Sequence, residues 1–353
     1  MADLTSYLAW RIVQGVGAQP GELILLLDHA GRDDLLREVA FTVELAGATP
    51  LIELASPDHL ARLLASGQTE YFAAYDRHRR AWRERADRCV VLAGGYLDLD
   101  GAPHDAVALW SAAQGRLTDV EEARRLPSLV VAVPTLAQAS RLGMSFESLE
   151  QLLQDATAPT LLELQDHIVR AQSRLEDAPE IIIRTGGGHE LRVVRGDRML
   201  LNNDGYIDDL DRERGAVVSS LPAGSIYFTV LEDQTEGSLH LPSVGGARDV
   251  VFCFERGRAA RVEAAAGADE LNALFDAQTG DPRRIGYIGI GLNPRLSHPI
   301  GWPLVDKHMH GAVVVTFGEN RHLGGQNASS LSEEFILSNA EIEADGQPIV
   351  NFG

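Results

Sequence analysis

The run from Asp306 to Glu334 contains the side chains best suited to acid–base chemistry. His308 and His310 lie there two residues apart, and an imidazole with its ordinary pKa of about 6.5 can move protons close to neutral pH. A carboxylate such as Asp306 or Glu334 could orient the imidazole or act as a base. An apolar strand predicted over 311–317 would hold these groups rigidly, and the glycine-rich turns after it could close over a ligand. The run therefore predicts a binding or catalytic site.

The composition limits the class of partner. The chain has 353 residues, 45% hydrophobic and 23% charged, which is enough for two domains with proper cores. Its 51 acidic residues outnumber its 31 basic ones and give a formal net charge of -20. That charge repels phosphate backbones and anionic lipid surfaces. We therefore expect a small-molecule substrate as the partner, and neither nucleic acid nor a membrane.

The chain shows no targeting or spanning pattern. Its first ten residues lack the basic and apolar regions of a secretory signal. No later segment reaches about 18 uninterrupted apolar residues. These features predict a cytoplasmic protein.

Short apolar runs alternate with helical patterns in the first half of the chain. The predicted strands are 22–27, 49–54, 89–93 and 129–133. Strands and helices that alternate at this length indicate an open parallel sheet with helices on both faces, the doubly wound α/β arrangement. We expect this domain to span residues 1–178.

The glycine pattern does not indicate a nucleotide cofactor. Residues 27–31, LDHAG, follow the first predicted strand where a dinucleotide site would have G-x-G-x-x-G, and G-x-x-x-x-G-K-[ST] does not occur in the chain. Residues 186–188 are three glycines between two predicted strands, which favours a hairpin turn over an anion site. We predict no cofactor.

The pattern changes in the second half to short strands separated by turns rich in Gly, Asp and Asn. The predicted strands are 181–184, 190–194, 225–231, 250–254, 285–290, 312–317 and 340–344. One predicted helix, 268–277, interrupts them. We expect a strand-rich α+β domain over residues 179–353 that carries the site, joined to the first domain by a linker at 176–179.

Several motifs of the second half follow one another in a recognisable order. They are PAGSIYFT at 222–229, RIGYIGIGLNP at 284–294, the run 306–318 and GGQN at 324–327. This order resembles the metallo-aminopeptidase family of aminopeptidases T and S, and the related dihydroxypyridine dioxygenases are similar. The resemblance implies an α/β domain followed by a catalytic domain of the aminopeptidase T type, and commonly a homodimer.

The positions that carry metal ligands in that family hold other residues here. Two glutamates become Ser225 and Tyr287, a histidine becomes Val314, and an H-x-D pair becomes residues 332–334, SEE. A valine cannot coordinate a metal, and hydroxyl groups are poorer ligands for a divalent cation than carboxylate or imidazole. Only Glu334 could still act as a ligand at a family position. We therefore expect the dinuclear metal site of the family to be absent.

A metal site built from other residues is an alternative. Its candidate ligands are His240, His298, His308, His310, His322 and Glu334. Three imidazoles and a carboxylate would be adequate for zinc or iron. The chain would then be a metallo-aminopeptidase or a ring-cleaving dioxygenase with a relocated metal.

The same region also supports chemistry without a metal, because its hydroxyl groups could donate hydrogen bonds to a carbonyl oxygen. We interpret the chain as a diverged aminopeptidase-like enzyme that acts on a small amide, ester or cyclic substrate by acid–base chemistry, through hydrolysis or a related rearrangement. The candidate catalytic residues are His308, His310, Tyr287 and Glu334. The candidate substrate-binding residues are Ser225, Glu236, Asn293, Asp306, Asn327 and Ser332. A non-catalytic small-molecule-binding protein on the same scaffold is the alternative.

Overall fold

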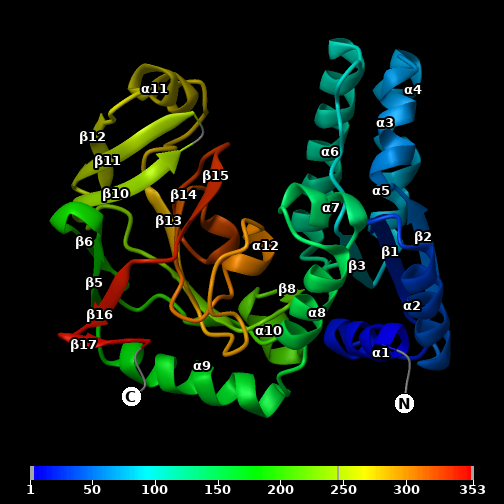
Figure 1. The fold of residues 1–353 in the computed structure, drawn as a ribbon, viewed down its shortest axis with the longest axis horizontal. Coiled ribbons are helices and arrows are strands. Elements are labelled where there is room, and N and C mark those ends of the chain that lie inside the picture. The colour runs from blue at the N-terminus through cyan, green and yellow to red at the C-terminus, as the bar shows by residue number, and fades with distance from the viewer. Residues whose placement is uncertain (1–3, 245, 351–353) are drawn as a thin grey trace. The chain divides into compact units, whose positions relative to one another are not determined.

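The computed structural model describes residues 4–244 and 246–350. They form two compact units (Figure 1). The first unit contains the chain up to Thr157 together with Gly205–Pro222, and the second contains Ala158–Asp204 and the chain from Ala223 onward. The division differs from the predicted boundary at residue 178, and one later segment returns to the first unit.

A five-stranded parallel sheet, sheet A, forms the centre of the first unit. Its strand order is β2-β1-β3-β4-β8, with β1 (Leu23–His29), β2 (Thr49–Leu54), β3 (Arg88–Ala93), β4 (Ser128–Ala132) and β8 (Val218–Leu221). The central strands β1 and β3 are almost wholly buried, as expected where both faces of a parallel sheet are covered. Strand β8 comes from the returning segment and pairs with β4.

Helices cover both faces of sheet A (Figure 1). The helices of this unit are α1 (Leu4–Val16), α2 (Asp33–Leu45), α3 (Pro57–Ala65), α4 (Thr69–Ala73), α5 (Asp76–Arg85), α6 (His104–Arg124), α7 (Leu136–Arg141), α8 (Phe146–Thr157) and α10 (Asp209–Arg214). Helices α1 and α2 pack together and against strands of the sheet, while α5 packs against β1 and α6. Leu25 and Cys89 of the sheet share a core cluster with Trp82 of α5. The predicted doubly wound arrangement is confirmed.

Helix α9 (Leu161–Glu176) belongs to the second unit, although the sequence places it in the first domain. A capping box begins it: the Thr160 hydroxyl accepts from the Glu163 N–H at 3.2 Å, and the Glu163 carboxylate accepts from the Thr160 N–H at 3.3 Å. The buried side of the helix, including Ile168 and Leu175, is part of the core of the second unit. Burial of this stripe explains why the boundary precedes the helix.

Two antiparallel sheets form the second unit. Sheet B has the order β12-β11-β10-β6-β5-β16-β17, with β5 (Glu180–Thr185), β6 (His189–Val194), β10 (Glu236–Val244), β11 (Ala247–Glu255), β12 (Arg258–Glu263), β16 (Glu341–Ala344) and β17 (Gln347–Pro348). Sheet C has the order β15-β14-β13-β9-β7, with β7 (Leu201–Asn203), β9 (Ser225–Thr229), β13 (Ile285–Gly291), β14 (Val313–Gly318) and β15 (Ser332–Leu337).

Few helices accompany these sheets, as predicted for a strand-rich α+β domain. Besides α9 they are α11 (Ala268–Asp276) and α12 (Pro303–Asp306), with 3-10 turns η1 (Gly186–Gly188) and η2 (Arg321–Leu323). The turn η1 connects the antiparallel pair β5 and β6. The predicted hairpin at the three glycines is therefore confirmed.

Apolar side chains from both sheets, α9 and α11 form one core. Strand β14 shows how sheet C contributes to it, since Val313, Val315 and Phe317 lie in the core cluster. Successive residues of a strand point to opposite faces, so Val314 and Thr316 lie on the other face of the sheet. We call this second face the outer face of sheet C.

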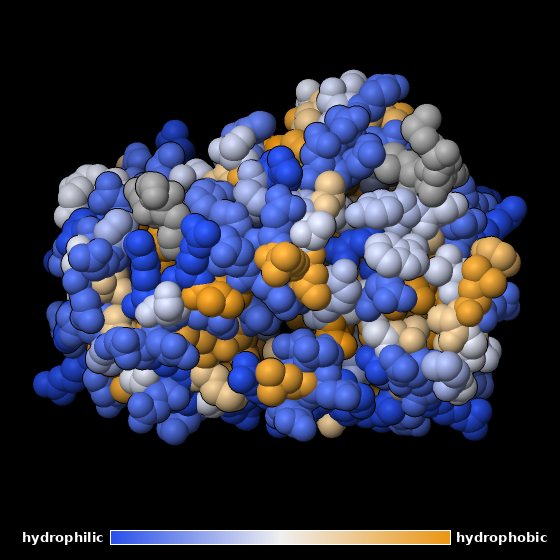
Figure 2. All heavy atoms as spheres, turned by 90° about the horizontal axis from the view of Figure 1, so that it is seen from below, coloured by the Kyte–Doolittle hydropathy of each residue, from blue (hydrophilic) through white to orange (hydrophobic). Residues whose placement is uncertain are grey.

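The surface is mainly polar where it is visible. Figure 2 shows a face that is largely hydrophilic, with apolar side chains in small separate groups. This agrees with a chain that carries a formal net charge of -20. None of the described helices is both long enough and apolar enough to cross a membrane.

Candidate active site

Strand register brings the positions at which the sequence analysis expects substituted metal ligands to the outer face of sheet C. Directly paired residues of antiparallel strands lie on the same face, and residues two apart on one strand share it. The pairs that fix the arrangement are Ser225↔Gly291, Thr229↔Tyr287, Gly289↔Val314, Thr316↔Glu334 and Gly318↔Ser332. Ser225, Tyr287, Val314, Ser332 and Glu334 therefore all lie on the face opposite the core.

Two side chains meet at the Glu334 carboxylate on this face. The Tyr287 hydroxyl donates a hydrogen bond to Glu334 Oε1. Lys307 Nζ lies 3.6 Å from the same oxygen, and the Lys307 and Glu334 side chains are 28% and 30% exposed. We call Tyr287, Lys307 and Glu334 the Tyr287 cluster. A phenol, an ammonium group and a carboxylate in contact can pass protons among themselves and to a bound ligand.

The environment of Tyr287 keeps its phenol protonated. Burial, reinforced by the Glu334 carboxylate, raises the pKa of Tyr287 well above its ordinary value. The nearby Thr316 hydroxyl acts in the opposite direction but does not outweigh burial. At neutral pH the phenol is therefore a hydrogen-bond donor.

His308 lies beside Ser225, in the turn that follows α12. Its Nδ1 is 3.2 Å from Ser225 Oγ, and the residue is 1% exposed. Burial first, and then the Lys307 charge, lower the pKa of His308 well below its ordinary value of 6.5. The imidazole is therefore neutral at pH 7. It enters the site as a neutral hydrogen-bonding group and not as an imidazolium acid.

His310 lies in different surroundings from His308. Its ring centroid is 5.8 Å from that of His167 on α9, and its other polar neighbours are backbone groups of Leu292 and Val350. Burial, and then His167, lower its pKa from 6.5. Strand β14 begins at Val313, so both histidines lie in the preceding turn. Residues two apart on a strand point to the same face, but these two histidines are not on a strand. Of the two, His308 contacts Ser225 and His310 does not.

Asp306 is occupied by the backbone. Its two carboxylate oxygens accept from the Ile300 N–H at 2.9 Å and the Gly301 N–H at 2.8 Å. Burial raises the pKa of Asp306 above its ordinary value, and these backbone donors act against that rise. The residue ties the last position of α12 to the segment that precedes the helix.

Three other predicted binding residues also support turns. Asn293 and Asn327 donate to backbone carbonyl groups at 2.6 to 2.9 Å, and Glu236 accepts from the Arg256 N–H at 2.8 Å. Asn side chains commonly fix turns through such bonds. Ser332 is exposed at the start of β15. A role for these residues in substrate binding stays a prediction.

The residues do not suit the metal site of the family that the sequence resembles. Val314 offers no donor atom, and the hydroxyl of Tyr287 is a poorer ligand for a divalent cation than a carboxylate. Within residues 4–244 and 246–350, no three His, Cys, Asp or Glu side chains lie close enough to hold a metal ion. The described residues therefore do not form the relocated site considered from His240, His298, His308, His310, His322 and Glu334.

Sequence reasoning overlooked Lys307. It concentrated on imidazoles, carboxylates and the family's ligand positions, and Lys307 is none of these. The composition could have pointed to it, because Lys307 is the only lysine among the 31 basic residues. The structure brings this one ammonium group to Glu334.

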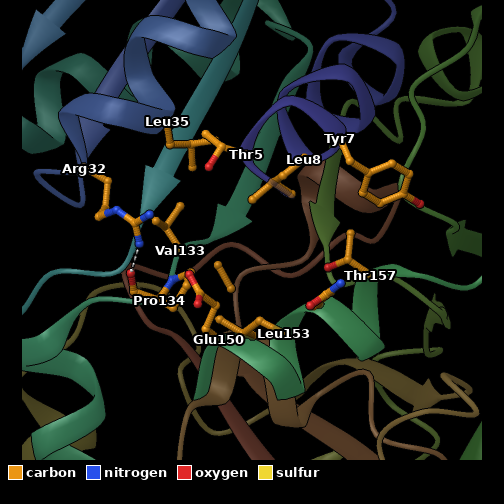
Figure 3. Close-up of a pocket in the computed structure, with 12 residues that line it drawn as sticks. Thr5, Tyr7, Leu8, Arg32, Leu35, Val133, Pro134, Glu150, Leu153 and Thr157 are labelled. Atoms are coloured by element: carbon orange, nitrogen blue, oxygen red, sulfur yellow. Dashed lines mark hydrogen bonds between the residues drawn. The ribbon is translucent and has the colours of Figure 1, made fainter. Parts of the chain in front are cut away.

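A cavity lies apart from these residues, in the first unit. It has about 570 Å³ of empty space, part of it open to solvent. Figure 3 shows Tyr7 and Leu8 on one side, Glu150 and Leu153 on the other, and Arg32 at one end. It adjoins the carboxyl end of β4, a usual place for ligands of open parallel sheets. None of the predicted site residues lines this cavity.

Comparisons with known proteins support the fold. No protein-family model matches the sequence, and no curated protein matches it. The structure is similar to wild-type AmpT from Thermus thermophilus, with a TM-score of 0.72 and 16% sequence identity over 96% of this chain and 94% of the other. It is also similar to 2,5-dihydroxypyridine dioxygenase from Pseudomonas putida KT2440, with a TM-score of 0.58 and 15% identity over 98% of this chain and 94% of the other. The predicted fold class is confirmed.

Proposed function

We propose that this protein is an enzyme of the aminopeptidase-like fold that acts on a small amide, ester or cyclic substrate by acid–base chemistry. The proposal is supported by the contact of Tyr287 and Lys307 with Glu334. Tyr287 and Glu334 stand at positions where the family that the sequence resembles has metal ligands, and Lys307 lies beside them. A metal in such a site polarises a carbonyl group. Hydrogen-bond donors aimed at the same oxygen can stabilise the charge that develops on it.

Each side chain has a definable role in such a reaction. In the substrate complex Tyr287 turns its one hydroxyl proton from Glu334 to the substrate carbonyl oxygen, and its raised pKa keeps that donor protonated. Glu334 accepts a proton from the attacking group and returns it to the leaving group. Neutral His308, together with Ser225, binds a polar group of the substrate.

Metal independence is part of the proposal, since the donor set at the family positions is unsuitable for a divalent cation. Catalysis by His310 would require a substrate that reaches its separate surroundings, so we give it no step in this reaction. The homodimer that the resemblance implies stays a prediction.

The test is an activity screen of the full-length protein with EDTA present. The substrates are amino-acid 4-nitroanilides, 4-nitrophenyl esters, lactones and lactams. We expect turnover of at least one class, and a loss of that turnover in Tyr287→Phe and Glu334→Gln. Tyr96→Phe is the matched control, because Tyr96 is exposed and belongs to the other unit.

Two outcomes would contradict the proposal. Turnover that EDTA abolishes and a divalent metal restores would support a metalloenzyme. Saturable binding of these compounds without turnover, in wild type and variants alike, would support the alternative of a non-catalytic binding protein.

A further inference from the structure

One amine distinguishes the candidate site from the rest of the chain. The 31 basic residues comprise 30 arginines and the single lysine Lys307. Wherever else this protein needs a side chain with a permanent positive charge, it has arginine. Lys307 lies next to His308, ion-pairs with Glu334 at 3.6 Å and is 28% exposed. The single lysine of the chain therefore lies among the residues to which we assign the proposed function.

Arginine and lysine share a charge but not a chemistry. The guanidinium group stays protonated in proteins and is not a nucleophile under ordinary conditions, whereas the lysine ammonium can lose a proton and attack a carbonyl carbon. If Lys307 only balanced the Glu334 charge, arginine could do so, as it does in the ion pairs of Arg83 and Arg88. A site that needs the amine itself cannot use arginine.

We propose that Lys307 forms a Schiff base with the carbonyl carbon of an aldehyde or ketone substrate. This inference rests on the proposed function, since it uses the same cluster, and it narrows the substrate to an amide, ester or cyclic compound that also carries an aldehyde or ketone group. The uniqueness of the amine, its contact with a carboxylate and the phenol on that same carboxylate oxygen together support it.

The step balances with the groups present. Glu334 takes one proton from the Lys307 ammonium, and the neutral amine attacks the carbonyl carbon. A C–N bond forms, and the carbonyl oxygen becomes a hydroxyl group as a second nitrogen proton moves to it. Tyr287 then protonates that hydroxyl, which leaves as water, while Glu334 returns its proton to Tyr287. The net change is a carbonyl group plus the lysine ammonium going to a protonated imine plus water, without oxidation or reduction.

A single lysine makes the test direct. The full-length protein is incubated at pH 7.5 with benzaldehyde, cyclohexanone or pyruvate and sodium cyanoborohydride, which reduces an imine to a stable amine. Peptide mapping by mass spectrometry then gives the rate of modification at Lys307 and at the N-terminal α-amine. The α-amine is a demanding internal control, because its ordinary pKa of about 7.7 to 8.0 leaves more of it unprotonated than an ordinary lysine.

We expect at least one probe to modify Lys307 about ten times faster than the α-amine, with a rate that saturates with probe concentration. Lys307→Arg should remove the adduct while thermal unfolding shows a folded protein. Tyr287→Phe should slow adduct formation about tenfold, because water then leaves without its acid. Tyr96→Phe should leave the rate unchanged.

Two results would overturn the inference. One is modification of Lys307 no faster than that of the α-amine with all three probes. The other is full turnover by Lys307→Arg of a substrate found in the activity screen, which would reduce Lys307 to a charge that positions Glu334. In that second case the proposed acid–base function survives, provided that Tyr287→Phe and Glu334→Gln remain inactive. The two proposals therefore fail separately.

Discussion

Two groups of buried or half-buried charged side chains, one in each unit, differ in the partners of their central carboxylate. In the first unit Glu53 accepts from Arg79 at 2.9 Å and from Arg83 at 2.9 Å, one arginine on each carboxylate oxygen, and Arg83 also donates to Glu121 at 2.6 Å. In the second unit Tyr287 and Lys307 both approach one oxygen of Glu334.

The difference separates a structural cluster from a reactive one. Each carboxylate oxygen of Glu53 has a guanidinium partner, and guanidinium groups do not release protons at working pH. The Tyr287 cluster is instead built from a phenol, an amine and a carboxylate, all of which can exchange protons and none of which is fixed by a bidentate pair. We therefore expect substitutions in the first cluster to change stability and substitutions in the second to change chemistry.

The largest expected effect is on catalysis by the Tyr287 cluster. Tyr287→Phe removes the proton donor and should lower kcat by about 10² to 10⁴, the usual range for a general acid or base. The free energy of unfolding should fall by only about 1 kcal/mol, because one hydrogen bond is lost. Steady-state kinetics and urea unfolding of the same preparation check both values. Loss of stability without loss of rate would make this cluster structural.

The matching experiment in the first unit is Glu53→Gln. It leaves Arg83, whose side chain is 5% exposed, with its charge uncompensated by Glu53, and should destabilise the protein by about 3 to 5 kcal/mol. The rate per folded molecule should stay at the wild-type value. Glu84→Gln is the control, because Glu84 is exposed on the same helix α5 and should change stability by less than about 0.5 kcal/mol. Equal effects of the two substitutions would show that the Glu53 network contributes nothing special.

A third experiment uses pH. The pKa of His308 in the folded chain is depressed well below its ordinary value of 6.5. As the pH falls below 6.5, the unfolded chain therefore binds a proton at His308 that the folded chain does not bind. Stability should therefore fall between pH 7 and pH 5, with His308 contributing up to about 1.4 kcal/mol per pH unit. His308→Gln should flatten the dependence measured by urea unfolding, whereas His59→Gln, at an exposed position, should not. An unchanged slope in His308→Gln would contradict a buried neutral imidazole.

The smallest expected effect concerns Asp306. Asp306→Asn can preserve one of the two backbone contacts with Ile300 and Gly301 but not both, and should destabilise the protein by about 1 kcal/mol. Because the carboxylate is engaged with the backbone, KM should change less than twofold. A large rise in KM with unchanged stability would return Asp306 to the substrate-binding role that the sequence predicts.

The sequence predicts those parts of the fold whose signal is local. Buried apolar runs mark β1 and β3, and glycine turns mark the hairpin at η1. Strand β8 escapes prediction because Val218–Leu221 is only four residues long, contains two serines and depends on a distant partner, β4. Helix α6 continues through Gly115, a residue type that weakens helices, and it packs against α4 and α5, which are distant from Gly115 in the sequence.

The candidate site also has parts that the sequence can predict and parts that it cannot. The shared face of Ser225, Tyr287 and Glu334 follows from strand pairing, since residues at alternate positions of a strand share a face. The separation of His308 from His310 could not be predicted, because it depends on the conformation of the turn that precedes β14. The contact of Lys307 with Glu334 depends on how that turn lies over sheet C. Only the count of lysines gives a hint of it in advance.

We propose that organic proton donors and acceptors stand in this site where the family that the sequence resembles has metal ligands. The most direct test is elemental analysis by inductively coupled plasma mass spectrometry of the full-length protein, both as purified and after incubation with zinc, iron, cobalt or manganese and removal of the excess by dialysis. We predict less than about 0.1 metal ion per chain in every case, because no suitable set of three ligands lies together in the described residues. One or two ions bound per chain, and lost in Glu334→Gln, would contradict a metal-independent site.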